Sequence, residues 1–157
     1  MLIVIFFSHD KKGPGERLLE EIQTRIHAHR IEVDHTVEAF SERFRSPMTD
    51  RPMVILVPES RERLEEFVSM ADLMSDIPIL LVLPDREPAT ISVGHRLYPR
   101  FVEDVDSDFS DLVSVLIKMI HHGSRRPLSQ PNIYADFRKN PTRRWKQVSE
   151  TGSNREN

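Results

Sequence analysis

The sequence predicts an α/β domain in which five parallel strands alternate with helices. Three observations point to this fold class. Short, continuous runs of β-branched and other apolar residues recur along roughly the first 123 residues. Segments with a helical spacing of apolar residues separate these runs, and proline, glycine or clustered polar residues mark the changes between them. A chain of 157 residues is about the size of one ordinary domain with a short appendage.

The first strand is expected over residues 2–7, whose uninterrupted apolar character is typical of a strand buried on both faces. Gly13-Pro14-Gly15 then breaks the chain, and apolar residues at helical spacing predict a helix to about Ala28. Alternation of apolar and polar residues over 31–37 indicates an outer strand with one wetter face. A short helix is expected over 38–45.

The same alternation continues after a proline-containing loop. Residues 53–57 form another buried strand, and Ser60 is placed to cap a helix whose apolar residues extend to Met74. Residues 77–83 form a fourth strand with Pro78 near its start, where a missing N–H donor does least harm.

The last elements are shorter or less regular. Proline, β-branched residues and glycine within 86–97 predict at most a weak helix. A short fifth strand at 100–102 precedes a final helix that begins near 106–108 and ends at Gly123. The first domain is therefore expected to span 1–123, followed by a tail over 124–157.

This order of elements resembles the flavodoxin-like class. The resemblance implies a three-layer sandwich with helices on both faces of a five-stranded parallel sheet, in the strand order 2-1-3-4-5. The proline-led strand at 77–82 and the acidic run Asp106-Ser107-Asp108 before the last helix resemble the matching segments of receiver domains from two-component response regulators.

The receiver resemblance implies a phosphorylation site whose side chains this sequence lacks. Receivers carry an acidic pair after the first strand, a phosphoacceptor Asp ending the third, Ser or Thr ending the fourth, and Lys ending the fifth. The corresponding positions here are Phe6 and Phe7, Val57, Leu83, and Glu103 or Asp104. None of the five side chains is retained, so the resemblance is to a degenerate pseudo-receiver without a phosphorylation site.

Acidic residues should nevertheless line the rim where the strands end, which is the general ligand position of open α/β sheets. The candidate rim residues are Asp10, Glu59, Asp85 and Asp104. They are interpreted either as water-facing loop ends or as oxygen ligands for a divalent cation. Because nucleotide-binding, serine-hydrolase and HExxH motifs are absent, and His27, His29 and His35 do not share a helix face, we expect no catalytic residue, metal site or cofactor.

The net charge of −3 is unevenly divided. Residues 124–157 carry eight basic and three acidic residues, a net +5, whereas the first 123 carry 14 and 22, a net −8. The tail also contains aromatic and arginine residues of the kind favoured as binding anchors. The predicted partner-binding residues are Tyr134, Phe137, Arg143, Arg144 and Trp145.

Several roles remain open for the tail. It lies back on the acidic body, within one chain or between subunits; it binds another protein; it contacts single-stranded nucleic acid; or it stays disordered. Its modest charge and the acidic body disfavour nucleic acid as a partner.

Composition restricts the setting of the protein. Cysteine is absent, which excludes disulfides and thiolate zinc sites and fits a cytoplasmic, reducing compartment. The apolar runs fall far below the roughly 20 residues of a membrane-spanning helix, so no membrane association is expected. The sequence thus predicts a non-catalytic pseudo-receiver signalling module that acts through protein–protein contacts and forms a homodimer. The alternative is a flavodoxin-like domain that binds a small ligand or divalent metal at the acidic rim, as a binding protein or as an enzyme.

Overall fold

The five strands form one parallel sheet in the order β2-β1-β3-β4-β5, which confirms the predicted flavodoxin-like α/β fold. A computed structural model describes residues 1–8, 12–27 and 29–123. These residues belong to the first of two units, Met1–Arg125. The candidate rim residue Asp10 and the predicted tail residues lie outside the described residues.

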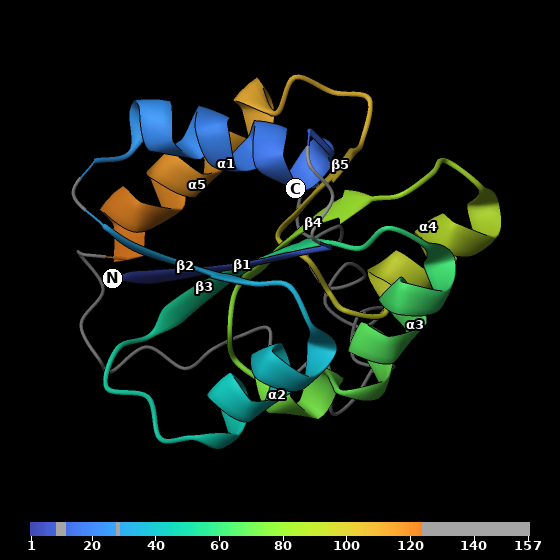
Figure 1. Ribbon diagram of the computed structural model, residues 1–157, viewed down its shortest axis with the longest axis horizontal. Helices are drawn as coiled ribbons and strands as arrows, with labels where there is room; N and C mark the ends of the chain where they lie inside the picture. Colours follow the sequence, from blue (N-terminus) through green and yellow to red (C-terminus); the bar gives the residue numbers. More distant parts are fainter. Residues whose placement is uncertain (9–11, 28, 124–157) are drawn as a thin grey trace, which may run out of the picture. The chain divides into compact units, whose positions relative to one another are not determined.

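The element boundaries are close to those expected. The strands are β1 (Leu2–Phe7), β2 (Arg30–Asp34), β3 (Pro52–Val57), β4 (Ile79–Leu83) and β5 (Phe101–Asp104). The helices are α1 (Pro14–Arg25), α2 (Val37–Arg45), α3 (Arg61–Ser69), α4 (Pro88–His95) and α5 (Ser110–Gly123), with a 3₁₀ turn, η1 (Ala71–Met74), after α3. α1 and α5 cover one face of the sheet, and α2, α3 and α4 cover the other (Figure 1).

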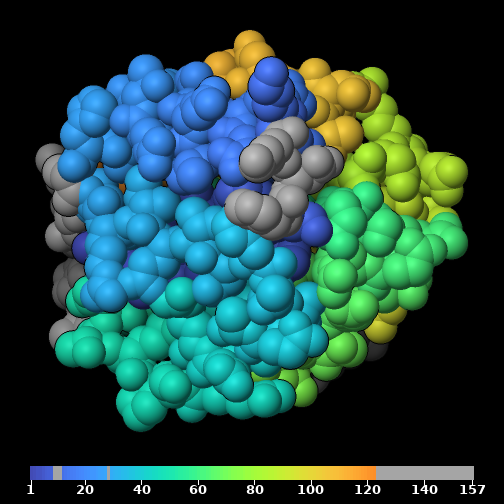
Figure 2. Space-filling model, viewed as in Figure 1, coloured from blue at the N-terminus to red at the C-terminus, as the bar shows by residue number. Residues whose placement is uncertain are grey.

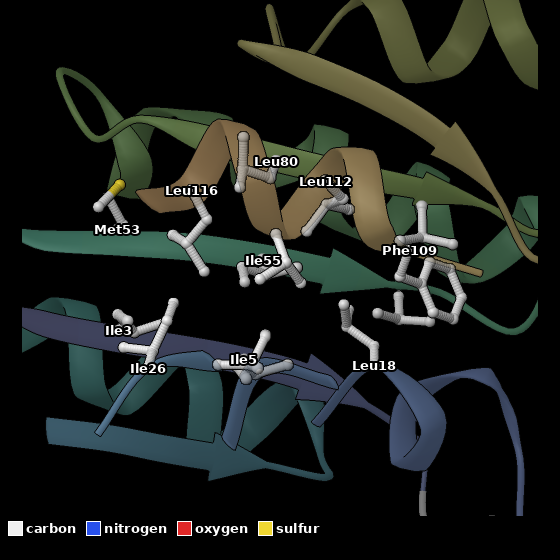
Figure 3. Packing of buried hydrophobic residues seen from close by; sticks show 14 of the residues in the cluster. Ile3, Ile5, Leu18, Ile26, Met53, Ile55, Leu80, Phe109, Leu112 and Leu116 are labelled. Carbon is white, nitrogen blue, oxygen red and sulfur yellow. The ribbon is translucent and has the colours of Figure 1, made fainter. Parts of the chain in front are cut away.

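The core has two halves because successive side chains of a strand point to opposite faces. On the α1–α5 side, Ile3 and Ile5 of β1 pack with Ile55 of β3 beneath the two helices (Figure 3). On the other side, the ring of Phe6 meets those of Phe40 and Phe67 edge-on, with centroids 5.9 and 4.6 Å away. Burial on both faces explains why the central strands are uninterrupted apolar runs.

Two boundaries differ from the expectation for identifiable reasons. The second strand ends at Asp34, because the Thr36 side chain accepts a hydrogen bond from Ala39 N (3.2 Å) and starts α2 at Val37. The helix capped by Ser60 ends at Ser69, and a separate 3₁₀ turn carries Met74 into the core.

The segment expected to be weakly helical forms the regular helix α4. Pro88 lies in its first turn, where a missing N–H donor has no cost. Gly94 lets the helix approach β4, since a Cβ atom there would lie 2.9 Å from the side chains of Leu81 and Leu83. Within the described part of the chain, no helix is long and apolar enough to cross a membrane.

Candidate functional site

The carboxyl ends of the central strands meet at one edge of the sheet, where the receiver resemblance places a phosphorylation site. Phe7 of β1 is in register with Val57 of β3, and Leu83 of β4 is in register with Asp104 of β5. Phe7 and Val57 are each 2% exposed, and Leu83 is 6% exposed. Buried hydrocarbon therefore occupies three of the predicted positions.

The sheet divides the predicted pocket residues between its two faces. Phe7 and Val57 project into the core half beneath α1 and α5, whereas Phe6 and Leu83 project into the half beneath α2, α3 and α4. Only Phe7 and Val57 are thus neighbours on the same face. Glu103 shares their face, because it is in register with Val82 of the same core half.

Phe7 is enclosed from above by the first turn of α1. A Cβ atom at Gly15 would overlap the Phe7 ring, so only glycine allows the helix to lie this close. The Phe7 ring also meets the His35 ring edge-on at 4.8 Å, and His35 Nδ1 lies 2.9 Å from the Phe7 carbonyl oxygen. The segment Gly13-Pro14-Gly15, expected to be only a turn before the helix, therefore has a packing role.

The loop between β5 and α5 is tied to α1 across the same edge. Arg17 donates a 2.6 Å hydrogen bond to the carbonyl oxygen of Val105, and its guanidinium lies 5.2 Å from the centroid of the Phe109 ring. Phe109 is buried in spite of a left-handed backbone (φ 62°). These contacts hold the loop against the buried ends of the strands.

Glu103 stands at one of the two positions that correspond to the receiver lysine. Its Oε2 atom is buried with no hydrogen-bond partner among the described residues. Burial raises the pKa of Glu103, although hydrogen bonds from Ser107 and from the backbone of Leu112 oppose the shift. A partly buried carboxyl group thus occupies a place where phosphate binding needs a cation.

The described acidic residues of the rim are already engaged. Asp104 accepts a hydrogen bond from Arg86 Nη2 (2.9 Å), which lowers the pKa of Asp104. Glu59 accepts one from Arg63 Nε (3.0 Å), and Asp85 accepts one from the backbone N–H of Glu87 (2.9 Å). Among the described residues, no three histidine, aspartate or glutamate side chains form a group that could hold a metal ion.

A charged groove lies beside the edge strand β2. It has a volume of about 510 Å³ and is lined by one face of β2, by α2 and by the loop after α2. Asp34, only 6% exposed, accepts two 2.7 Å hydrogen bonds from Arg43, which also pairs with Glu32. This network accounts for the wetter face expected for this strand, and its charges neutralise one another.

Tyr98 is a surface feature that the sequence reasoning missed. It follows α4, its side chain is 57% exposed, and its backbone is left-handed with φ 51°. Its backbone N–H donates a hydrogen bond to the carbonyl oxygen of His95 (3.0 Å), as a residue just past a helix end commonly does. A tyrosine where glycine is favoured was the available signal in the sequence.

Comparisons of the chain with family models, with curated proteins and with solved structures found no match.

Proposed function

We propose that this chain is a receiver-like signalling module that catalyses no reaction, acts through protein–protein contacts and is not switched by phosphorylation. One observation carries the proposal: the side chains of Phe7, Val57 and Leu83 fill the strand ends with hydrocarbon. A phosphoryl-accepting site needs a carboxylate nucleophile and oxygen ligands for Mg²⁺, and these side chains supply neither.

The charges around the strand ends support the same proposal. A bound phosphoryl group needs positive charge close by, whereas Glu103 and Asp104 stand where the resemblance places the lysine. Arg86 is the nearest cation described here, and it is paired with Asp104. An incoming phosphate would have to displace that ion pair and approach the carboxyl group of Glu103.

The alternative function, binding of a small ligand or divalent metal at the acidic rim, has weaker support. Glu59 and Asp104 form ion pairs with arginines, and Asp85 accepts a backbone hydrogen bond. A ligand would therefore compete with bonds that already exist.

The proposed contacts with other proteins involve two parts of the chain. By the receiver resemblance, one is the surface of α4 and β5, through which two copies would pair as a homodimer. The other is the tail anchor set Tyr134, Phe137, Arg143, Arg144 and Trp145, which lies outside the described residues. A cytoplasmic signalling protein is the partner that this proposal implies.

Phosphotransfer is the first test of this function. The full chain is incubated with a small-molecule phosphodonor and Mg²⁺ and then examined by intact-mass spectrometry. We expect no mass increase, with a genuine receiver domain as the positive control. A phospho-aspartyl or phospho-glutamyl group on Asp10, Glu59 or Asp85 would refute the proposal.

Sedimentation of the full chain over a range of concentrations tests the homodimer. We expect a concentration-dependent dimer that Tyr98→Asp weakens. A monomer at every concentration would refute this part of the proposal and leave the phosphotransfer result unaffected.

A further inference from the structure

The surface formed by α4 and the start of β5 differs from the rest of the described surface. Only Thr90 and Gly94 of α4 are buried, while Ile91 and Val93 are half-buried. α4 packs beside α3 at the edge of the domain (Figure 2). The helix therefore keeps part of its apolar surface in contact with solvent.

This surface also lacks the acidic residues that dominate elsewhere. No aspartate or glutamate occurs from Pro88 to Val102, whereas each of the helices α1, α2, α3 and α5 carries at least one. The same segment contains His95, Arg96 and Arg100. Arg96 is exposed and forms no ion pair with the described residues. A basic surface thus interrupts a body whose net charge is −8.

Tyr98 lies between the two arginines in the sequence and carries an energetic cost. A left-handed backbone costs a residue with a Cβ atom about 1–2 kcal/mol. With 57% of its side chain exposed, Tyr98 has little core burial to offset that cost. Backbone strain at an exposed position is typical of binding sites, and tyrosine flanked by arginine has the composition of an interaction hot spot.

We infer that the surface made by Ile91, Val93, Arg96, Tyr98 and Arg100, named here the α4–β5 patch, binds an acidic segment of a partner protein. Tyr98 is the anchor, the arginines pair with carboxylates, and the half-buried aliphatic side chains contact apolar residues of the segment. The acidic body repels an extended polyanion such as RNA but leaves room for a short acidic peptide. This inference rests on the proposed function, because it names the partner chemistry of a protein-interaction module.

Binding of a fluorescein-labelled peptide of glutamate, leucine and serine to the full chain tests the inference by fluorescence anisotropy. We expect saturable, salt-sensitive binding that Tyr98→Gly and Arg96→Gln each weaken about tenfold or more. Arg45→Gln removes one exposed arginine from the end of α2 and is the matched control, with affinity unchanged. Tyr98→Gly should also raise the melting temperature, because glycine tolerates the left-handed backbone. A merely structural tyrosine would not combine higher stability with lost binding.

Three results would overturn the inference. The first is no saturable binding of the acidic peptide. The second is an affinity that neither patch variant changes, which would assign the peptide to basic residues elsewhere, such as those after Gly123. The third is preference for a matched lysine peptide that depends on Tyr98, which would refute the acidic partner and leave the proposed interaction module intact. A phosphodonor adduct, in contrast, would refute the module itself.

Discussion

Replacing Val57 by aspartate restores the residue type that a receiver uses as its phosphoacceptor and tests how the strand ends are packed. Val57 is 2% exposed and lies beside Phe7 beneath α1 and α5. Losing a buried valine side chain costs about 1.5–3 kcal/mol. A buried carboxyl group without partners adds a further penalty of about 1–3 kcal/mol or more. We therefore expect Val57→Asp to remove about 3–6 kcal/mol, a large part of the roughly 5–15 kcal/mol of a typical domain.

The penalty should depend on pH in a defined direction. Burial raises the pKa of the introduced carboxyl group in the folded state above its unfolded value of about 3.9. The unfolded state then loses its proton first, so the stability deficit grows as the pH rises above about 4 and is smallest below that value. Urea unfolding followed by circular dichroism, at several pH values and relative to the wild-type chain, measures this difference.

Val57→Thr is the matched control, because threonine keeps the shape of valine and adds a hydroxyl group that does not titrate in this range. Its penalty should be smaller and independent of pH. A Val57→Asp variant that is as stable as wild type at pH 7 would refute the reasoning, because the carboxylate would then have reached water or a cation. Uptake of phosphate by that variant would refute it more strongly.

Three further variants test single contacts. Gly15→Ala should destabilise the domain by about 1–3 kcal/mol, because the new methyl group overlaps the Phe7 ring; urea unfolding should show a smaller loss in a Phe7→Leu background, and an equal loss would contradict the contact. Thr90→Val should stabilise by about 1 kcal/mol, because the buried hydroxyl has no partner among the described residues; a lower melting temperature would reveal a hydrogen bond. Glu103→Gln should gain stability over wild type only above about pH 4.5, because burial raises the pKa of Glu103 and its ionisation opposes folding there. A pH-independent difference would contradict that cause.

The fold was predictable because its strands and most helices have strong local signals. The apolar run of β1 and the alternation in β2 each match the burial of those strands. The regular helix α4 was underestimated, because the contact of Gly94 with Leu81 and Leu83 is a tertiary effect that local propensity does not contain. The Thr36 cap that ends the second strand early was readable in principle but competed with the continued alternation to Val37.

The candidate site was predictable only in part. Strand order placed Phe7 and Val57 side by side, and their apolar character was evident from the sequence. The role of Gly15 depends on which side chain lies beneath it, and the Asp34–Arg43 pair depends on the turn between β2 and α2. The left-handed backbone of Tyr98 runs against the preference of its residue type, so no propensity would have found it.

The central claim is that the carboxyl ends of the strands form a closed apolar core with no phosphate or Mg²⁺ site. Amide chemical shifts of the isotopically labelled full chain, recorded during titration with Mg²⁺ and then with a phosphodonor, test this most directly. The account predicts that the amides of Phe7, Val57, Leu83 and Glu103 keep their positions throughout. Saturable shifts confined to these strand ends would contradict it.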